Sequence, residues 1–277
     1  MRIAFIGDLH YPSMIGKNEK VKEARDAFYA KFLHTFFELE ADYYVSIGDL
    51  TNFGKEDELH EVYEIIRKYE KPFIHTFGNH DLYGVSRDEV LNISNSEQNI
   101  SIATDKVNII SLETARDHDH EDYGGYISDK QLQWLKAEIE ESEEKLVIIF
   151  AHHPVYDTTA NSNFPYLSIQ PDIPILDVLR KKKGNGIYIN GHNHKDSIET
   201  IDNWTFVQAN AVLDDQSIRV LEINDNEISI QSFNAATSEL KSMAQIIGSN
   251  INHFQLSPLG MGTTPNREIV IKKTVTV

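Results

Sequence analysis

Gly78-Asn79-His80-Asp81 follows the apolar run Phe73–Thr76, which has the length and composition of a buried β-strand. In layered α/β folds, ligand-binding side chains gather just beyond the carboxyl ends of the strands. The amide, imidazole and carboxylate of this stretch therefore lie where a functional loop is expected. Taken alone, the stretch fits an Asn/Gly turn equally well, so its meaning depends on the rest of the chain.

Similar polar segments follow other predicted strands. The strands are predicted at Arg2–Ile6, Tyr43–Ile47, Val107–Leu112, Leu146–Phe150 and Gly186–Ile189, and the polar segments are Asp8-Leu9-His10, Gly48-Asp49, His152-His153-Pro154 and Gly191-His192-Asn193-His194. Each segment alone also fits an ordinary turn or polar loop. Their joint occurrence after strands of one chain favours a single site at one rim of the fold.

The spacing within these segments suits metal ions. Asp8 and His10 are two residues apart, as are His192 and His194. In extended backbone this spacing turns both side chains of a pair to the same side, so each pair can hold one ion. A carboxylate such as Asp49 has two oxygens with which to bridge two ions. Two ions about 3.5–4 Å apart activate a shared water for phosphoryl displacement, so the pattern indicates two-metal hydrolysis.

Helical spacing separates most of the strands. We predict helices at Glu19–Glu38, Lys55–Tyr69, Ser128–Glu141 and Ile173–Lys183, which together with the strands indicates a layered α/β fold. Beyond about Asn203 the alternating segments Thr205–Gln208, Ser217–Ile223 and Glu227–Phe233 predict sequential antiparallel strands that form a second sheet beside the first. A further helix is expected within Asn234–Ile247 and a final alternating strand within Glu268–Val277.

Composition excludes several classes of function. The formal net charge is −17, from 43 acidic and 26 basic residues, which argues against binding long nucleic acid through a basic surface. The chain has no cysteine, so disulfides, thiolate metal sites and cysteine nucleophiles are all excluded. The first apolar run is too short for a signal peptide or a membrane span, so we expect a cytoplasmic protein that does not bind membranes.

Together, and in this order, the five segments resemble the calcineurin-like metallophosphoesterase superfamily, whose pattern runs D-x-H, G-D, G-N-H-[DE], H, G-H-x-H. The match spans Asp8 to His194. The aspartate of Gly78-Asn79-His80-Asp81 and the stretch from Gly125-Tyr126-Ile127-Ser128 to Leu135 resemble the bacterial cyclic-nucleotide phosphodiesterase-like (class III) branch. The Asp-Arg-Gly extension typical of protein phosphatases is replaced by Leu50-Thr51-Asn52, which disfavours phosphoprotein substrates.

This resemblance implies a fold and a ligand set. The fold is a four-layer αββα sandwich of two mixed β-sheets flanked by helices, over residues 1–235, with a C-terminal extension of helix, loop and final strand at 236–277. Two divalent ions, with Mn, Fe or Zn favoured, are expected. One is held by Asp8, His10 and His194, the other by Asn79, His152 and His192, and Asp49 bridges both.

The resemblance also implies a catalytic role for His80, as a donor to phosphate or leaving group. In several relatives an acidic residue orients this histidine, and here Asn52 takes that position, so Asn52 is expected to orient His80 through its amide. Asp81 is an alternative partner. His153 either faces the substrate or is buried or solvated. Surface or core positions are expected for the other histidines, which are His34, His60, His75, His118, His120 and His253, and the run Asp117–Asp122 is interpreted as a solvated loop.

The expected activity is hydrolysis of a small phosphodiester, such as a cyclic nucleotide or a glycerophosphodiester, by a metal-bridging hydroxide. Alternatives are a phosphomonoesterase, a nucleotide pyrophosphatase, or a binding module that has kept the fold without catalysis. The expected partner is a small phosphate-ester substrate. A homodimer is a further possibility, and so is a role in assembly in which Arg267–Val277 supplies an edge strand to a partner.

Overall fold

A computed structural model describes residues 1–257 and 259–272 of the chain. Its elements, in chain order, are β1 (Arg2–Ile6), α1 (Glu19–Glu38), β2 (Tyr43–Ser46), α2 (Glu56–Arg67), β3 (Phe73–His75), the 3-10 helix η1 (His80–Leu82), α3 (Arg87–Ser94), β4 (Ile100–Ala103), β5 (Val107–Leu112), α4 (Asp129–Glu141), β6 (Leu146–Ala151), α5 (Ile175–Leu179), β7 (Gly186–Asn190), β8 (Ser197–Ile201), β9 (Trp204–Gln208), β10 (Ser217–Ile223), β11 (Glu227–Asn234), α6 (Ser238–Gly248), α7 (Thr264–Arg267) and β12 (Ile269–Lys272).

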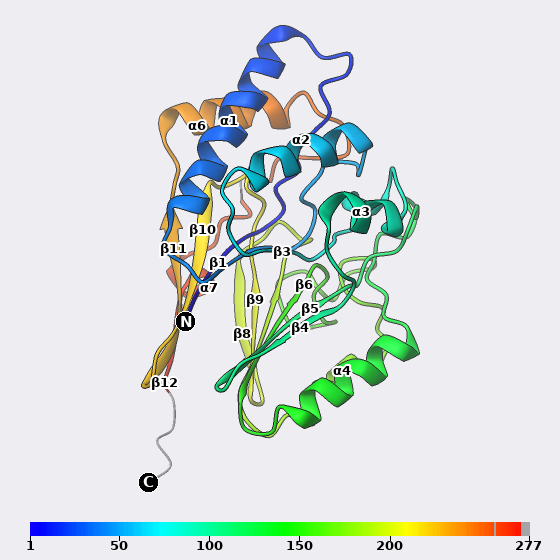
Figure 1. Cartoon of the computed structure of the whole chain (residues 1–277), viewed down its shortest axis with the longest axis vertical. Helices are drawn as coiled ribbons and strands as arrows, with labels where there is room; N and C mark the ends of the chain where they lie inside the picture. The colour runs from blue at the N-terminus through cyan, green and yellow to red at the C-terminus, as the bar shows by residue number, and fades with distance from the viewer. Residues whose placement is uncertain (258, 273–277) are drawn as a thin grey trace.

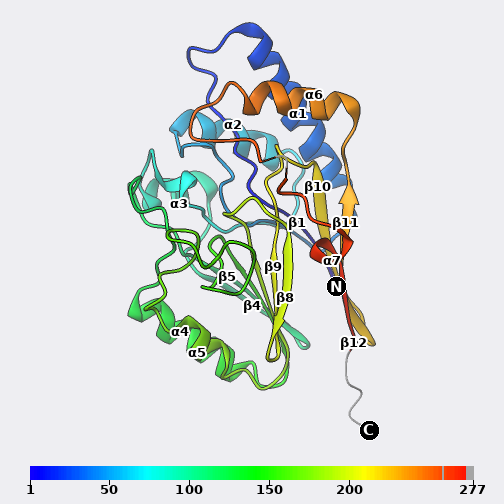
Figure 2. The same ribbon diagram turned by 180° about the vertical axis from the view of Figure 1, so that it is seen from behind.

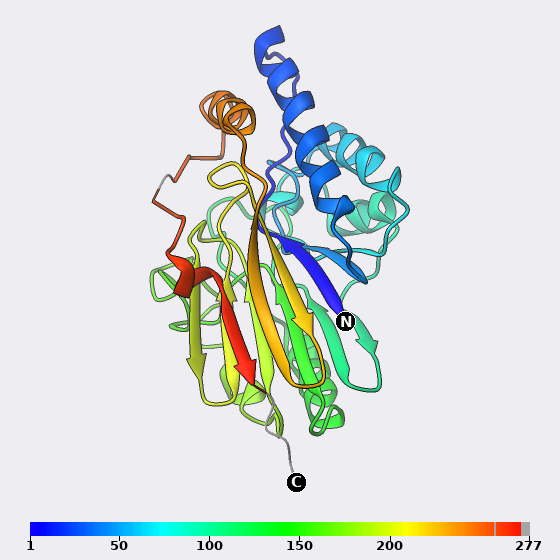
Figure 3. The same ribbon diagram turned by 90° about the vertical axis from the view of Figure 1, so that its left-hand side faces the viewer.

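The strands form two six-stranded sheets. The first has the order β12-β11-β10-β1-β2-β3 and the second the order β4-β5-β6-β7-β9-β8. Within them, β1, β2 and β3 are parallel to one another, as are β5, β6, β7 and β9, while the remaining neighbours are antiparallel. Figure 3 shows the first sheet lying in front of the second.

Alternating side chains of β1 show how the layers are held. Ile3 and Phe5 point into an apolar layer between the two sheets, which they share with Ile148 and Phe150 of β6. Ala4 and Ile6 point the other way, into a layer with α1, α2 and α6. This alternation is the period of a strand buried on both faces.

On its other face the second sheet packs against α4 and α5, where Ile149 of β6 meets Leu135 of α4 and Leu179 of α5. Helices therefore cover both outer faces. In Figure 1, α1, α2 and α6 lie at the top and α4 lies at the bottom. Seen from behind, α5 lies beside α4 (Figure 2). The predicted four-layer αββα sandwich is confirmed.

The early strand predictions agree with the structure to within one residue at each end, and α1 has the predicted bounds. The predicted helix Ile173–Lys183 is much shorter, at Ile175–Leu179. Its later start follows from Pro174, which disfavours helical backbone at Ile173. The predictions omitted β4, β8, α3, η1 and α7. Of the predicted final strand, Ile269–Lys272 is β12, and 273–277 lie outside the described residues.

One topological prediction is wrong. The segments after Asn203 do not form a sheet of their own: β9 pairs in parallel with β7 in the second sheet, whereas β10 pairs with β1 in the first. Local alternation predicts a strand but carries no information about which distant strand it pairs with. In the C-terminal region, α6 packs beside α1, and β12 pairs with β11. A domain boundary at residue 235 remains a prediction.

Candidate metal centre

The predicted ligands lie in loops that follow β1, β2, β3, β6 and β7. Parallel strands of one sheet end at the same edge, so these loops meet where the edges of the two sheets come together. Backbone hydrogen bonds tie the loops to one another. His10 N donates to the Asp49 carbonyl at 2.9 Å, and Gly191 N donates to the His152 carbonyl at 3.0 Å.

The first group of side chains joins His10, His194, Asp8 and Asp49. Nε2 of His194 lies 3.1 Å from Nε2 of His10 and 3.0 Å from Oδ2 of Asp8. Nε2 of His10 lies 3.8 Å from Oδ2 of Asp49. Donor atoms about 3 Å apart match the edges of a coordination shell whose metal–ligand distances are about 2.0–2.2 Å. This group therefore has the dimensions of a metal site.

The second group joins His152, Asn79, His192 and again Asp49. Nε2 of His152 lies 3.1 Å from Oδ1 of Asn79, 3.2 Å from Nδ1 of His192 and 3.3 Å from Oδ2 of Asp49. The same carboxylate oxygen of Asp49 thus faces both groups. A shared carboxylate between two sets of nitrogen and oxygen donors is the arrangement that the family resemblance implies. His192 and His194 lie in different groups, so the expectation from spacing that this pair holds one ion is wrong.

Hydrogen bonds behind the donors fix which atom faces the centre. His152 Nδ1 lies 3.0 Å from the carbonyl of Ile47, so Nε2 is left for the centre. His192 Nε2 lies 2.9 Å from the carbonyl of Tyr166, which leaves Nδ1. Such outer contacts set the tautomer and orientation of metal-binding histidines.

The backbone at this centre is constrained by close approach. A Cβ atom on Gly191 would lie 2.1 Å from Oδ1 of Asp8, so only glycine lets the two loops meet there. His10, Asp49, His192 and His194 have positive φ angles of 50°, 48°, 70° and 47°. Left-handed backbone is unfavourable for these residue types and is retained at functional sites by the surrounding structure.

Electrostatics also favour a cation. Burial lowers the pKa of His152, but the carboxylates of Asp49 and Asp8 outweigh it and raise the pKa to about 9. Burial, and then the neighbouring His152, lower the pKa of His192 to about 4, leaving a neutral imidazole. Oδ1 of Asp8 is buried with no hydrogen-bond partner among the described residues. A metal ion would supply the positive charge, and this mixed N/O donor set suits Mn, Fe or Zn.

Comparison with known proteins places the chain in a family. The sequence profile of calcineurin-like phosphoesterases matches residues 1–196. The chain belongs to the calcineurin-like phosphoesterase family. A curated relative from Arcobacter nitrofigilis, described as a probable glycerophosphodiester phosphodiesterase GpdQ, is 26% identical over 159 residues, or 56% of this chain and 57% of the relative. The match therefore spans little more than half of the relative's length.

Two solved structures share the fold of this calcineurin-like phosphoesterase. A dimetal phosphatase from Danio rerio superposes with a TM-score of 0.66 at 17% identity, covering 84% of this chain and 95% of the other. GAP50 of Plasmodium, described as the anchor in the inner membrane complex, superposes with a TM-score of 0.54 at 15% identity, covering 93% of this chain and 96% of the other. At these identities the likeness shows the fold alone.

His80 lies beside the phosphoesterase ligands but is held differently from the prediction. Its Nδ1 lies 2.8 Å from the backbone carbonyl of Asn52, not from the side-chain amide. The Asn52 amide donates instead to the carbonyl of Asn252 at 2.8 Å. Asp81 is no substitute, because its carboxylate is buried against His75 Nε2 at 3.0 Å. Asn52 therefore contacts His80 through its carbonyl oxygen and not through its amide, and the catalytic role of His80 stays a prediction.

His153, the neighbour of His152, is fully buried. Its Nδ1 lies 2.8 Å from Oγ1 of Thr114 and its Nε2 lies 2.9 Å from the carbonyl of Tyr123. Because both of its ring nitrogens contact other protein atoms, His153 supports the loop and leaves no nitrogen for a metal ion. Asn79 completes the second group of donors instead.

A cavity of about 570 Å³ opens above the centre of this phosphoesterase. It is lined by Asp49, Asn79, His80, His192, His194 and by Phe53, Tyr83, His120, Tyr123, Leu167 and His253. None of the second set was named as a site residue from the sequence, although Tyr83 falls in the loop Leu82–Arg87, where substrate specificity is expected. Tyr83 and Phe53 follow the motifs closely, so position in the chain was a usable signal. His120 and His253 were expected only at surface or core positions, and nothing local marks them as cavity residues.

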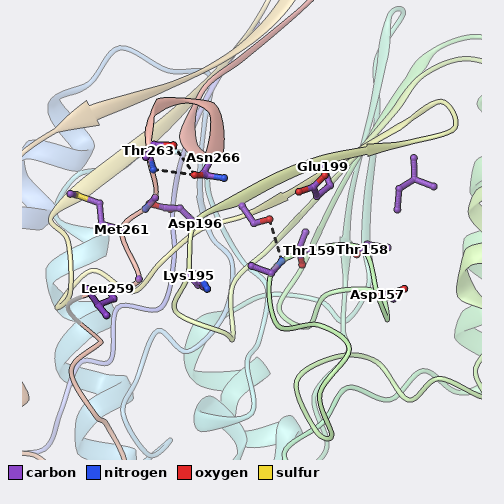
Figure 4. A pocket seen from close by; sticks show the side chains of 15 residues that line it. Asp157, Thr158, Thr159, Lys195, Asp196, Glu199, Leu259, Met261, Thr263 and Asn266 are labelled. Carbon is purple, nitrogen blue, oxygen red and sulfur yellow. Dashed lines mark hydrogen bonds between the residues drawn. The ribbon is translucent and has the colours of Figure 1, made fainter.

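A second cavity, of about 550 Å³, lies between residues 157–160, β8 and residues 259–266 (Figure 4). Its buried carboxylate, Asp196, lies 2.5 Å from Nη2 of Arg219 and 3.4 Å from Nε of Arg267. None of the described residues lining it is a histidine. The phosphoesterase chemistry therefore belongs to the first cavity.

Proposed function

We propose that this chain is a metal-dependent phosphodiesterase that hydrolyses a small phosphodiester at a two-metal centre. The observation that carries the proposal is the position of Asp49 Oδ2, 3.3 Å from His152 Nε2 of one donor group and 3.8 Å from His10 Nε2 of the other. Two bound divalent ions would polarise the phosphate and lower the pKa of a water held between them.

The protein's own contribution to the reaction centres on His80. Its Nδ1 is directed to the Asn52 carbonyl, so Nε2 is free to serve the substrate, and it lies 3.9 Å from Oδ2 of Asp49 at the floor of the cavity. Because a carbonyl only accepts, Nδ1 carries the proton of the neutral ring, so Nε2 can donate a proton or hydrogen bond to a departing oxygen only when the ring is protonated as the imidazolium. The backbone contact fixes the ring without adding a negative charge.

Charge supports a diester over a monoester. Among the described residues that line the cavity, none is lysine or arginine, so bound ions would be the main source of positive charge. A phosphodiester carries one negative charge, whereas a monoester carries nearly two at neutral pH. The match to a probable glycerophosphodiester phosphodiesterase agrees with this preference.

The partner is proposed to be a small phosphate ester. The net charge of −17 opposes long nucleic acid. Within residues 1–257 and 259–272, no helix has the length and apolarity needed to cross a membrane. A cytoplasmic location and a homodimer remain predictions.

The test is hydrolysis of bis(p-nitrophenyl) phosphate and p-nitrophenyl phosphate by chelator-stripped protein that is then supplied with Mn, Fe, Zn or no metal. We expect turnover only with metal, and a higher kcat/KM for the diester. Asp49→Asn should abolish it, whereas the exposed Asp172→Asn should not. A higher kcat/KM for the monoester would replace the diesterase with a phosphomonoesterase. Full activity of metal-loaded Asp49→Asn would overturn the bridging role.

A further inference from the structure

One side of the cavity is a cluster of aromatic rings. Phe53 and His120 are stacked, with centroids 5.2 Å apart and planes at 17°. Phe53 also contacts His253 at 4.5 Å, and His120 contacts Tyr83 at 4.5 Å. We call these four residues the aromatic wall. They come from four distant parts of the chain, and all line the cavity above the predicted metal ligands.

The wall adjoins His80. The rings of His80 and Tyr83 lie 4.8 Å apart. Under the proposed mechanism, His80 serves the oxygen of the departing group. That group must therefore lie next to His80, and the neighbouring surface is the aromatic wall.

The C-terminal region supplies one member of the wall. Residues 249–256 follow α6 and run over the metal centre. The Asn52 amide donates to the Asn252 carbonyl at 2.8 Å, and Lys17 Nζ donates to the Asn250 carbonyl at 2.5 Å. Phe254 packs 4.8 Å from the ring of His10. These contacts hold His253 at the cavity, although it lies outside the matched residues 1–196.

The wall is suited to an uncharged planar group. Partial desolvation, and then the nearby His80 and His120, lower the pKa of His253, which keeps its ring neutral at neutral pH. His120 and His253 are exposed and Phe53 is half-buried, so ring surface is open to a ligand. Flat heterocycles stack on such surfaces without requiring a specific hydrogen bond.

We propose that Phe53, Tyr83, His120 and His253 form a subsite that binds a planar aromatic or heterocyclic leaving group of the phosphodiester. This inference rests on the proposed function and deepens it. It makes residues 249–256 part of the specificity of the enzyme, and it predicts poor recognition of purely aliphatic leaving groups such as glycerol.

Binding of two inert diester analogues tests the subsite without requiring turnover. Monomethyl benzylphosphonate and monomethyl ethylphosphonate each carry one charge, have a methylene in place of the leaving oxygen, and differ in having or lacking a ring. Dissociation constants are measured by calorimetry on the manganese-loaded protein. We expect the benzyl compound to bind about tenfold more tightly to the wild type, as stacking on aromatic side chains predicts.

Variants of the aromatic wall test whether its rings cause the preference for the benzyl compound. In His253→Ala and Phe53→Leu the ratio of the two dissociation constants should fall to about threefold or less as stacking is lost. His60→Ala, at an exposed histidine of α2, is the matched control and should keep the wild-type ratio. Circular dichroism and manganese content confirm that each variant is folded and loaded.

Equal binding of both analogues to the wild type, or an unchanged ratio in both wall variants, would overturn the subsite. Hydrolysis of bis(p-nitrophenyl) phosphate is measured separately on the same samples. Ring preference without hydrolysis would leave the subsite standing as a binding site but reject its role for a leaving group and the proposed function. Hydrolysis without ring preference would reject the subsite alone.

Discussion

The side-chain amide of Asn79 donates from Nδ2 to the hydroxyl of Tyr83 at 2.6 Å. This contact leaves Oδ1 of Asn79 facing Nε2 of His152 at 3.1 Å, in the second group of donors. An amide has one donor end and one acceptor end, and only the oxygen is a useful metal ligand. Tyr83 therefore determines which end of Asn79 faces the centre.

Replacing Tyr83 by Phe tests this positioning. The ring stays in the aromatic wall, but the amide of Asn79 loses its hydroxyl partner. Loss of an outer contact of this kind typically weakens metal affinity by about 10–100-fold. Competition with a metal-binding dye measures the affinity, with the exposed Tyr126→Phe as control. Unchanged affinity for both ions would contradict the assignment.

Gly191→Ala tests the close approach of two motif loops. The new Cβ would lie 2.1 Å from Oδ1 of Asp8, so Asp8 or the loop must move. We expect lower manganese occupancy, and a loss of about 1–3 kcal/mol in the free energy of unfolding, as for overpacked sites. Gly124→Ala, whose Cβ would come no closer than 3.2 Å to any atom, is the milder comparison. Wild-type occupancy and stability in Gly191→Ala would show that the contact is not needed.

The structure separates the roles of His80 and Asn52. His80→Ala should lower kcat by about 100-fold or more, the usual contribution of a general acid, for methyl benzyl phosphate, whose alkoxide leaving group needs a proton. Asn52→Ala keeps the backbone carbonyl that contacts His80 Nδ1 but loses the amide contact to Asn252, so KM should rise while kcat stays close to that of the wild type. An equally deep loss of kcat in Asn52→Ala would restore the side-chain role that the sequence predicts.

Glu113 should make the stability of the protein depend on pH. Burial outweighs the nearby Arg87 and raises the pKa of its carboxyl from 4.5 to about 7. A raised acid pKa contributes stability that is fully present below pH 4.5 and is lost as the pH rises through 7. Glu113→Gln cannot ionise. The stability of this variant relative to the wild type should therefore rise between pH 5 and pH 8, by at most about 1.4 kcal/mol per unit of pKa shift.

Urea unfolding of the two chelator-stripped proteins at both pH values measures that difference. A difference that is the same at pH 5 and pH 8 would show that Glu113 has no raised pKa in the folded protein.

Much of the fold and of the centre follows from local sequence. Strands such as β6 are continuous apolar runs, and the polar segments that follow strands mark the loops that meet at the centre. The seven predicted ligands are brought together because parallel strands end at a common edge. Here chain position and residue type were sufficient.

Long-range pairing was not predictable in the same way. Nothing in the alternation of Ser217–Ile223 specifies pairing with β1, so the strands after Asn203 were assigned to the wrong sheet. The aromatic wall was not predictable from the sequence for the same reason. His253 reaches the centre through contacts such as the one between Asn52 and Asn252, which join residues 200 positions apart. Side chains recruited over such distances leave no local pattern.

The most direct test of a two-metal phosphodiesterase measures bound metal and turnover in the same sample. Chelator-stripped protein is reconstituted with manganese, its bound metal is measured by mass spectrometry, and its hydrolysis of bis(p-nitrophenyl) phosphate is followed. A two-metal phosphodiesterase should bind two manganese ions per chain and regain an activity that is absent without metal. A folded protein that binds no manganese and hydrolyses nothing, with iron and zinc giving the same result, would contradict it.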